Sequence, residues 1–267
     1  MDTPLKAASA VSRRANSVHL NDRPCSQCPL RGCATFQPIK PEELAVIDEL
    51  KQSEVEFDAG IDLIREGDSD SGLYTLLAGW AYRYKTLADG RRQILNVLLP
   101  GDFIGLQQKM DAVASHGVRA LTPVRLCSFR RDAVWALHRD VPSLGYDVTW
   151  LAAHGERLVD DNLLNVGQRG ALEGTAALLL VLHARAAPFD PGDVEQDGIV
   201  FPLTQQHLAD AMGLSLIHTH RTLRKLQQDK LVEWRAGQQR LRVPDLKKLA
   251  AVARIRWPLE PALRPLI

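Results

Sequence analysis

Four cysteines are the residues of this 267-residue chain whose type and spacing best suit chemistry. Cys25, Cys28 and Cys33 follow a C-x2-C-x4-C pattern in a segment held open by prolines and a glycine, whereas Cys127 lies far along the chain. Such a loop can turn several thiolates toward one centre. So few cysteines in so long a chain argue against a disulfide scaffold, and clustered cysteines in a reducing compartment more often serve metal or redox chemistry.

A second pattern occupies residues 203–228, which predict two short helices joined by a tight turn. Thr204 can cap the first helix, with His207 at the capping-box position in place of the usual acid. Gly213 can end this helix because glycine enters the left-handed conformation without a Cβ penalty. Ser215 can then cap the second helix.

The second helix is apolar on one side and basic on the other, which fits the major groove of DNA. The residues expected to face inward are Leu216, Thr219, Leu223 and Leu226. The residues predicted to contact DNA are Thr204, Gln205, Ser215, Ile217, His218, His220, Arg221, Arg224 and Lys225. The alternative is an ordinary helical hairpin with a solvated basic face.

The residues after this hairpin favour the DNA-binding interpretation. Residues 231–234 and 240–243 predict two short strands around a turn at 236–238, which makes a winged helix. Cations outnumber acids between Arg221 and Arg242, and a local excess of cations suits phosphate contacts with a salt-dependent affinity.

The elements that must position these residues begin with a run of short strands separated by turns rich in glycine. Many short strands at regular spacing predict a β-roll or jelly-roll sandwich, and residues 41–51 predict a short helix before it. The expected strands are 55–57, 62–65, 72–78, 80–86, 93–99, 117–120 and 124–129.

Pro142 can open a long helix that runs to about Gln168. Its apolar residues alternate in steps of four and three, which resembles a coiled-coil seam and favours a homodimer. The predicted interface residues are Leu144, Val148, Leu151, Gly155, Leu158 and Asn162. The alternative is a helix that packs on its own β-roll.

The predicted fold class is α+β, with an N-terminal β-roll sensor domain, a long dimerisation helix and a C-terminal winged helix-turn-helix. Residues 1–22 are expected to be a disordered tail. The expected divisions are a flexible N-terminal segment with the cysteine cluster (1–40), the β-roll (41–141), the dimerisation helix (142–168), the DNA-binding domain (169–255, with a loop at 187–199) and a C-terminal tail (256–267).

Composition restricts where the chain could act. The net charge of +1 places any nucleic-acid surface in a local patch. No apolar run approaches the roughly 20 residues of a membrane helix, and the N-terminus lacks the apolar core of a signal peptide. We therefore expect a cytoplasmic protein that does not bind membranes.

Four motifs, at residues 57–60 (FDAG), 64–67 (IREG), 73–79 (LYTLLAG) and 99–105 (LPGDFIG), appear ahead of the helix and the winged domain. Together and in this order they resemble the CRP/FNR family of bacterial transcription regulators over residues 40–250. The resemblance implies a homodimer that binds a two-fold-symmetric operator in double-stranded DNA and touches RNA polymerase. It also implies that the β-roll senses a signal and passes it through the dimer helix.

Family members that bind cyclic AMP carry a glutamate soon after the Gly-Asp-Phe turn and an Arg-Ser pair further on. Here Leu106 follows Gly105, and residues 114–117 (ASHG) contain no arginine. A buried phosphate without a cation would be poorly held. We therefore expect no cyclic nucleotide.

The oxygen-sensing FNR branch holds a [4Fe–4S] cluster with an N-terminal cysteine cluster and one cysteine in the β-roll. The resemblance assigns Cys25, Cys28, Cys33 and Cys127 as the ligands. The best-known FNR pattern has one more residue before its third cysteine, which puts Cys33 in most doubt. The alternatives are a zinc or thiol-redox switch, or a regulator without a cofactor.

Two further comparisons concern specificity and class. The best-known family members carry a glutamate early in the recognition helix and an arginine four residues on, whereas here Ile217 and Arg221 hold those positions. The operator should therefore differ from the usual family sequences. The β-roll also resembles cupin enzymes, but its only histidines, His116 and His138, do not make a ligand set, so we expect no enzyme.

Overall fold

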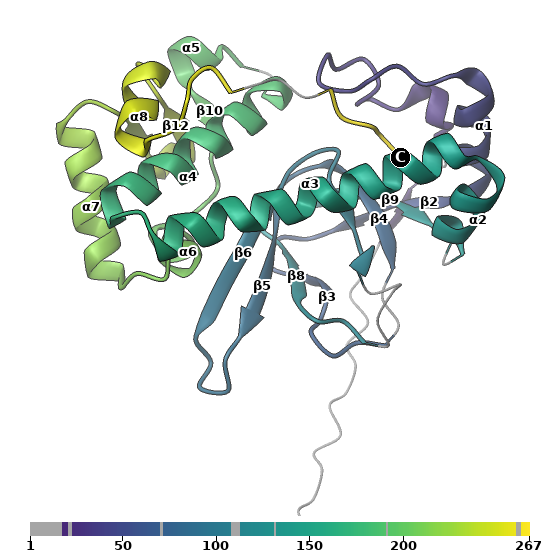
Figure 1. The fold of residues 1–267 in the computed structure, drawn as a ribbon, viewed down its shortest axis with the longest axis horizontal. Helices are drawn as coiled ribbons and strands as arrows, with labels where there is room; N and C mark the ends of the chain where they lie inside the picture. The colour runs from purple at the N-terminus through teal and green to yellow at the C-terminus, as the bar shows by residue number, and fades with distance from the viewer. Residues whose placement is uncertain are drawn as a thin grey trace, which may run out of the picture.

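The computed structural model describes residues 18–20, 23–69, 72–107, 113–130, 132–190, 192–259 and 263–267. A single long helix, α3 (Pro142–Gly167), runs along the molecule, with the strands below it and a helical domain at one end (Figure 1). This order of β-roll, long helix and helical second domain with a helix-turn-helix confirms the predicted α+β fold class.

The β-roll consists of two antiparallel sheets, with strand orders β1-β2-β9-β4-β7 and β3-β8-β5-β6. Its centre is filled by apolar side chains from both sheets, among them Leu76, Val118 and Leu126, each at most 1% exposed. The strands are β1 (Val18–Leu20), β2 (Lys51–Phe57), β3 (Asp62–Ile64), β4 (Leu73–Ala78), β5 (Ala81–Thr86), β6 (Arg92–Leu98), β7 (Phe103–Ile104), β8 (Gly117–Ala120) and β9 (Val124–Phe129).

Residues 23–40, which we call the cysteine segment, were predicted to be flexible. In the structure they are packed against the rest of the chain. Leu30 and Phe36 are buried against α1 (Pro41–Leu50) and its neighbours because they are the apolar residues of an otherwise polar loop. The prediction of a disordered tail is wrong for residues 18–20, which pair with β2 as strand β1. The rest of that predicted tail lies outside the described residues.

The predicted dimer seam on α3 is wrong for most of its residues. Leu144, Val148 and Leu151 are buried within their own chain, in a cluster with α1 and an unpredicted helix, α2 (Ala133–Asp140). Asn162 is also buried, and its amide donates to the carbonyl oxygens of Leu95 and Ala211 at 3.3 and 3.2 Å. Gly155 and Leu158 are half-buried on the same side. Periodicity identified the buried face of α3, which here packs on the same chain.

The second domain packs helices around a small antiparallel sheet of order β10-β12-β11. Leu179, Phe201 and Leu226 lie in its core and are at most 1% exposed. Its elements are α4 (Ala171–Ala186), η3 (Ala187–Phe189), α5 (Val194–Asp197), β10 (Ile199–Val200), α6 (Gln205–Met212), α7 (Leu216–Gln228), β11 (Glu233–Arg235), η4 (Ala236–Gln238), β12 (Arg240–Arg242) and α8 (Leu246–Ala253).

The two domains share apolar and polar contacts. Trp80 of the β-roll packs edge-on against Phe201, with ring centroids 6.1 Å apart, and Leu99 lies in the same cluster. Arg92 of β6 forms an ion pair of 2.6 Å with Asp210 of α6. The second domain is therefore held on the β-roll of the same chain.

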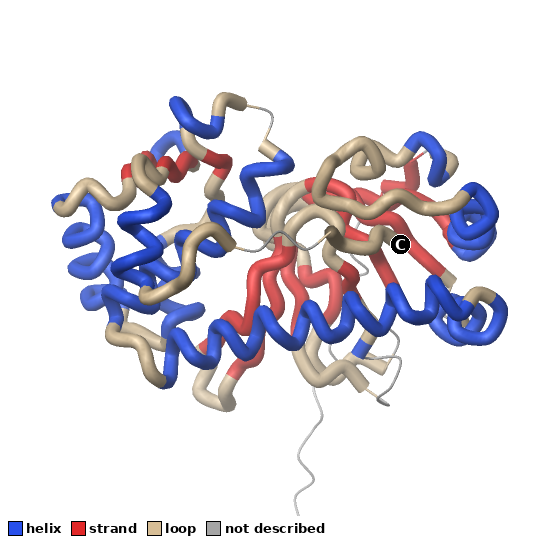
Figure 2. Tube along the Cα trace, turned by 45° about the horizontal axis from the view of Figure 1, so that its top comes forward, coloured by secondary structure: helices blue, strands red, loops and turns tan. Residues whose placement is uncertain are grey.

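Residues 263–267, which we call the strap, return to the β-roll instead of extending as a tail. In Figure 1 the strap is the yellow segment that ends beside α3 and the cysteine segment, and Figure 2 shows the same neighbours from another side. Leu266 and Ile267 are each 5% exposed. Within the described ranges, no helix is both long and apolar enough to cross a membrane.

Candidate nucleic-acid interface and cysteine pocket

The helix-turn-helix forms through the local signals that its sequence carries. The Thr204 hydroxyl accepts from the backbone N–H of His207 at 3.2 Å, and His207 Nδ1 accepts from the Thr204 N–H at 3.1 Å. Gly213 has φ of +63° and ends α6 in the left-handed conformation. The Ser215 hydroxyl caps α7 by accepting from His218 N–H at 3.3 Å. The predicted capping box and caps are confirmed.

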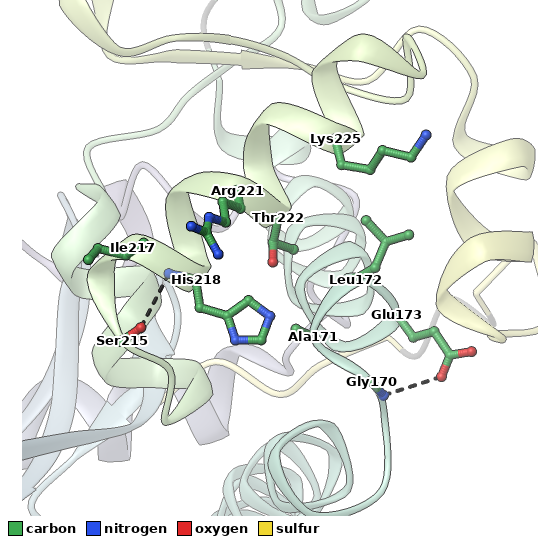
Figure 3. A pocket seen from close by; sticks show the side chains of 10 residues that line it. All are labelled: Gly170, Ala171, Leu172, Glu173, Ser215, Ile217, His218, Arg221, Thr222 and Lys225. Atoms are coloured by element: carbon green, nitrogen blue, oxygen red, sulfur yellow. Dashed lines mark hydrogen bonds between the residues drawn. The ribbon is translucent and has the colours of Figure 1, made fainter.

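The outward side of α7, which we call the recognition face, presents the predicted DNA-contacting residues to solvent. Figure 3 shows Ile217, His218, Arg221 and Lys225 along α7, beside a hollow whose opposite wall is the start of α4. Ile217 is 68% exposed. Lys225 pairs with Asp229 at 2.8 Å, whereas Arg221 makes no ion pair within the described part of the chain. Arg221 is therefore free to bind a base or a phosphate.

Two of the residues predicted to contact DNA, Gln205 and His220, are within hydrogen-bonding distance of each other across the turn. His220 Nδ1 lies 3.3 Å from Oε1 of Gln205, which joins the exposed side of α7 to the first turn of α6. On the inner side, Thr219, Leu223 and Leu226 are buried as predicted. Leu216 was predicted to face inward, but it is 47% exposed, because the first turn of α7 extends beyond the core.

The wing is present, but its cations are used within the chain. Arg240 donates to the Asp197 carbonyl at 3.3 Å and lies 3.5 Å from Asp190. Arg242 pairs with Glu233 at 2.8 Å and donates to the carbonyl of Glu195 at 2.7 Å. These arginines fix the wing on α5 and on Asp190 in the loop before it. The excess of cations predicted for this region is therefore concentrated on α7.

Three of the four cysteines line one pocket, which we call the cysteine pocket. Cys25 begins η1 (Cys25–Gln27), Cys28 follows it, and Cys127 lies on β9 opposite them. The backbone N–H of Cys25 donates to Asp48 of α1 at 2.9 Å, which holds the loop in place. Residues that are distant in sequence thus meet between the cysteine segment and the β-roll.

Cations and apolar side chains surround these thiols. Lys51 and Glu54 line the pocket as an ion pair of 3.4 Å, with side chains only 6% and 5% exposed. Arg31 and the strap residues Leu266 and Ile267 also line the pocket, with apolar side chains such as Leu77 and Phe129.

Burial keeps two of these thiols, those of Cys25 and Cys127, protonated at neutral pH. Burial, with the Asp48 carboxylate beside the thiol, raises the pKa of Cys25 to about 12. Burial also raises the pKa of Cys127 far above its usual range, against the opposing effect of Lys51. A metal or cluster would have to displace these protons in order to bind.

Cys33 points to a different hollow. Its sulfur lies 3.5 Å from the Thr35 hydroxyl and 3.8 Å from the carbonyl oxygen of Pro188 in η3. This second hollow is lined by Leu30, Trp80 and Phe189, among others. The structure therefore brings together three of the predicted ligands and leaves Cys33 beside them. No group of three or more metal-ligating side chains with metal-binding geometry occurs among the residues described.

The β-roll contains a cation that the sequence did not lead us to expect. Arg83 arrives from β5 and donates to His116 Nε2 at 3.2 Å and to Gln107 Oε1 at 2.9 Å. His116 belongs to the segment 114–117, which carries no arginine of its own, whereas Gln107 follows the Gly-Asp-Phe turn. Burial, with Arg83 and Lys85 nearby, lowers the pKa of His116 to about 4, so the imidazole is neutral at pH 7. The absence of a cyclic nucleotide remains a prediction.

An exposed, capped recognition helix beside a wing, joined to a β-roll, defines a DNA-binding transcription regulator. Two family descriptions match the chain: "Cyclic nucleotide-binding domain" over residues 54–140 and "Crp-like helix-turn-helix domain" over residues 175–252. The transcriptional activatory protein AadR of Rhodopseudomonas palustris is 30% identical over 207 residues, which cover 78% of this chain and 84% of that protein. The chain belongs to the CRP/FNR family of transcription regulators.

Other relatives agree in length and fold. The nitrogen fixation regulation protein FixK of Bradyrhizobium diazoefficiens is 29% identical over 79% of this chain and 86% of that protein. The transcriptional activator protein FnrL of Cereibacter sphaeroides is 28% identical over 84% of this chain and 90% of its own. The structure of FixK2 from Bradyrhizobium japonicum superposes with a TM-score of 0.67 at 20% identity, over 76% of this chain and 97% of that one. This last similarity concerns the fold alone.

Proposed function

We propose that this protein binds a two-fold-symmetric operator as a homodimer, touches RNA polymerase there, and is controlled by a [4Fe–4S] cluster at its cysteines. The observation that carries the DNA-binding part is the recognition face of α7, which is exposed, basic and fixed by a cap at its start. A dimer would place two such helices in successive major grooves of one face of the duplex.

Arg221 and Ile217 are the residues that would read the sequence. A free guanidinium can bind the O6 and N7 atoms of a guanine bidentately, and such a pair discriminates by about 1–3 kcal/mol. Ile217 carries no hydrogen-bonding group and, at 68% exposed, suits the methyl group of a thymine. We therefore expect each half-site to contain a guanine, with a thymine close to it.

The test is selection of binding sequences from a random duplex pool, followed by affinity measurements at several salt concentrations. Arg221→Ala should weaken binding about 5- to 150-fold and abolish the preference at one base pair of each half-site. Arg139→Ala, which changes an exposed arginine on α2, is the matched control and should bind as the parent does. An equal loss on every sequence would make Arg221 a phosphate contact and refute its reading role.

The dimer would form through the exposed side of α3, opposite to the buried face. Tyr146 is 69% exposed and Leu163 is 68% exposed. Leu164 and Val166, near the end of the same helix, are 45% and 42% exposed. Single exposed apolar side chains are ordinary, but several along one helix favour a covered surface.

The cysteine site supports the sensing part of the proposal through its donor set. Three thiols share a pocket with Lys51 and Arg31, and these cations suit the negative charge of an iron–sulfur centre held by thiolates. When bound, the cluster would supply a centre sensitive to oxygen and redox state. Cys25, Cys28 and Cys127 would hold it, and Cys33 would become the fourth ligand by turning away from Pro188. These residues would then tie the cysteine segment to β9.

The test is purification without oxygen, followed by assays of iron, acid-labile sulfide and zinc and by the visible spectrum before and after exposure to air. The proposal expects iron and sulfide near four each per subunit and an absorbance that bleaches in air. Cys28→Ser and Cys127→Ser should lose the cluster, whereas Ser128→Ala, the neighbour of Cys127 on β9, should keep it. Stoichiometric zinc without sulfide would favour a zinc switch. If neither iron nor zinc is found, the four cysteines are ordinary thiols.

A further inference from the structure

The strap fills the space in which a group bound by the three cysteines would lie. Leu266 and Ile267 line the same pocket as Cys25, Cys28 and Cys127, and both are 5% exposed. The volume that remains free in this pocket is about 20 Å³, which is room for about one water molecule. An inorganic cluster with eight core atoms cannot enter such a space while the strap is in place.

The strap is held mainly by the cysteine segment. The Arg264 N–H donates to the Thr35 carbonyl, and the Gln37 N–H donates to the Arg264 carbonyl, both at 2.9 Å. The Arg31 guanidinium, between Cys28 and Cys33, donates to the Leu266 carbonyl at 3.1 Å. Thus the loop that carries the candidate ligands also carries the anchors of the strap.

Two contacts with the β-roll complete the attachment. The Thr75 hydroxyl on β4 donates to a backbone oxygen of Ile267. The Arg264 guanidinium pairs with Asp102 and lies over the Phe36 ring, 5.7 Å from its centroid. Asp102 also binds Arg185 of α4 at 2.7 Å, so the strap shares a carboxylate with the DNA-binding domain.

We propose that the strap is a displaceable plug: it occupies the ligand space of the cysteine pocket and must leave before the thiols can bind an iron–sulfur cluster. This inference rests on the proposed function for the identity of the bound group. Coupling between two binding events is reciprocal, so a weaker strap should favour loading and loading should release the strap. Release would also remove Arg264 from Asp102 and so alter a contact that Arg185 of the DNA-binding domain shares.

The first experiment uses the full chain without iron and needs no cluster. Leu266→Ala removes most of the side chain that fills the pocket, whereas Leu263→Ala changes the same residue type at a strap position that is 59% exposed. The rate at which a small thiol reagent modifies Cys25 and Cys127 is followed by mass spectrometry. We expect Leu266→Ala to raise this rate at least about tenfold, and Leu263→Ala to leave it unchanged. Equal rates in the two variants would overturn the plug.

The second experiment measures amide hydrogen exchange of residues 264–267 before and after anaerobic reconstitution with iron and sulfide. We expect protected amides in the iron-free protein and at least about tenfold faster exchange in the loaded protein. Cluster formation with the strap still protected would overturn the plug and leave the proposed function standing. Failure to bind iron would overturn the proposed cluster, while the thiol rates would still decide whether the strap closes the pocket.

Discussion

Replacing Asp102 by asparagine should destabilise this protein more than any exposed charge replacement would. Asp102 follows β6 and is 4% exposed. It accepts from the Leu99 N–H at 2.8 Å and pairs with Arg185 of α4 and Arg264 of the strap. An asparagine at this position would keep the volume of the side chain and remove its charge. Two buried guanidinium groups would then lose their shared counter-ion.

The magnitude follows from the burial of the partners. The Arg185 side chain is 14% exposed and that of Arg264 is 7% exposed, so water cannot replace the lost carboxylate. Removing one partner of a buried ion pair costs about 3–5 kcal/mol. Because the asparagine oxygen still accepts one hydrogen bond, we expect the lower value, about 3 kcal/mol.

The stabilisation that Asp102 provides should depend on pH in a definite direction. Burial would raise the pKa of Asp102, but Arg185 and Arg264 prevail and hold it below its usual range. The stabilisation is therefore complete above the unfolded pKa of about 3.9 and is lost as the pH falls toward the folded pKa. The difference between Asp102→Asn and the parent should thus be constant near pH 7 and shrink below about pH 4.

Urea unfolding monitored by circular dichroism, at pH 7 and at lower pH, measures the effect. Asp89→Asn is the matched control because Asp89 also pairs with an arginine, Arg91, but the two side chains are 54% and 77% exposed. That variant should unfold at the same urea concentration as the parent. Equal midpoints for Asp102→Asn and Asp89→Asn would refute the view that Asp102 neutralises two buried cations.

Three other changes have expected outcomes. Leu163→Glu should convert the dimer to a monomer in light scattering. The control, Leu87→Glu at a 58% exposed position on the β5–β6 hairpin, should remain a dimer. If both variants remain dimers, the exposed side of α3 is excluded as the interface. The parent should lose stability between pH 7 and pH 5, because the folded pKa of His116, about 4, lies below the unfolded value, so that the unfolded chain takes up the proton first. His116→Gln should reduce this loss by about 2 kcal/mol. The same dependence of unfolding free energy on pH in parent and variant would contradict this prediction. Thr204→Ala should cost about 1 kcal/mol in thermal unfolding and Thr204→Ser much less, since serine keeps the hydroxyl that caps α6; equal losses would mean that the cap contributes little.

Local signals allowed much of the fold to be predicted from the sequence. The caps at Thr204 and Ser215 and the left-handed Gly213 act within a few residues, so their effect can be deduced without knowing the tertiary structure. Seven of the nine described strands of the β-roll were also predicted within a few residues, because turn residues separate them, whereas the short strands β1 and β7 were not predicted. Helix α2 was missed, although its apolar residues Val134 and Leu137 are buried.

The errors concern contacts between distant segments. The apolar periodicity of α3 shows which side is buried, but the identity of the covering surface depends on the whole chain. Asn162 illustrates this, since its partners Leu95 and Ala211 lie on β6 and α6. The strap was taken for a tail because its anchors, such as Thr35 and Asp102, are remote in sequence. Cys33 was grouped with the other cysteines by spacing, whereas its contact with Pro188 depends on how the two domains pack.

The contacts between the domains bear on how a signal at the cysteines could reach DNA. A dimer binds two half-sites only if its two α7 helices are held at a fixed separation, which requires a fixed DNA-binding domain. The Arg92–Asp210 pair fixes α6, and the Asp102–Arg185 pair fixes the end of α4. Only the second of these pairs is linked to the strap, because Asp102 also binds Arg264. Departure of the strap would therefore leave Asp102 to Arg185 of α4 alone, while the Arg92–Asp210 pair at α6 would keep both of its partners.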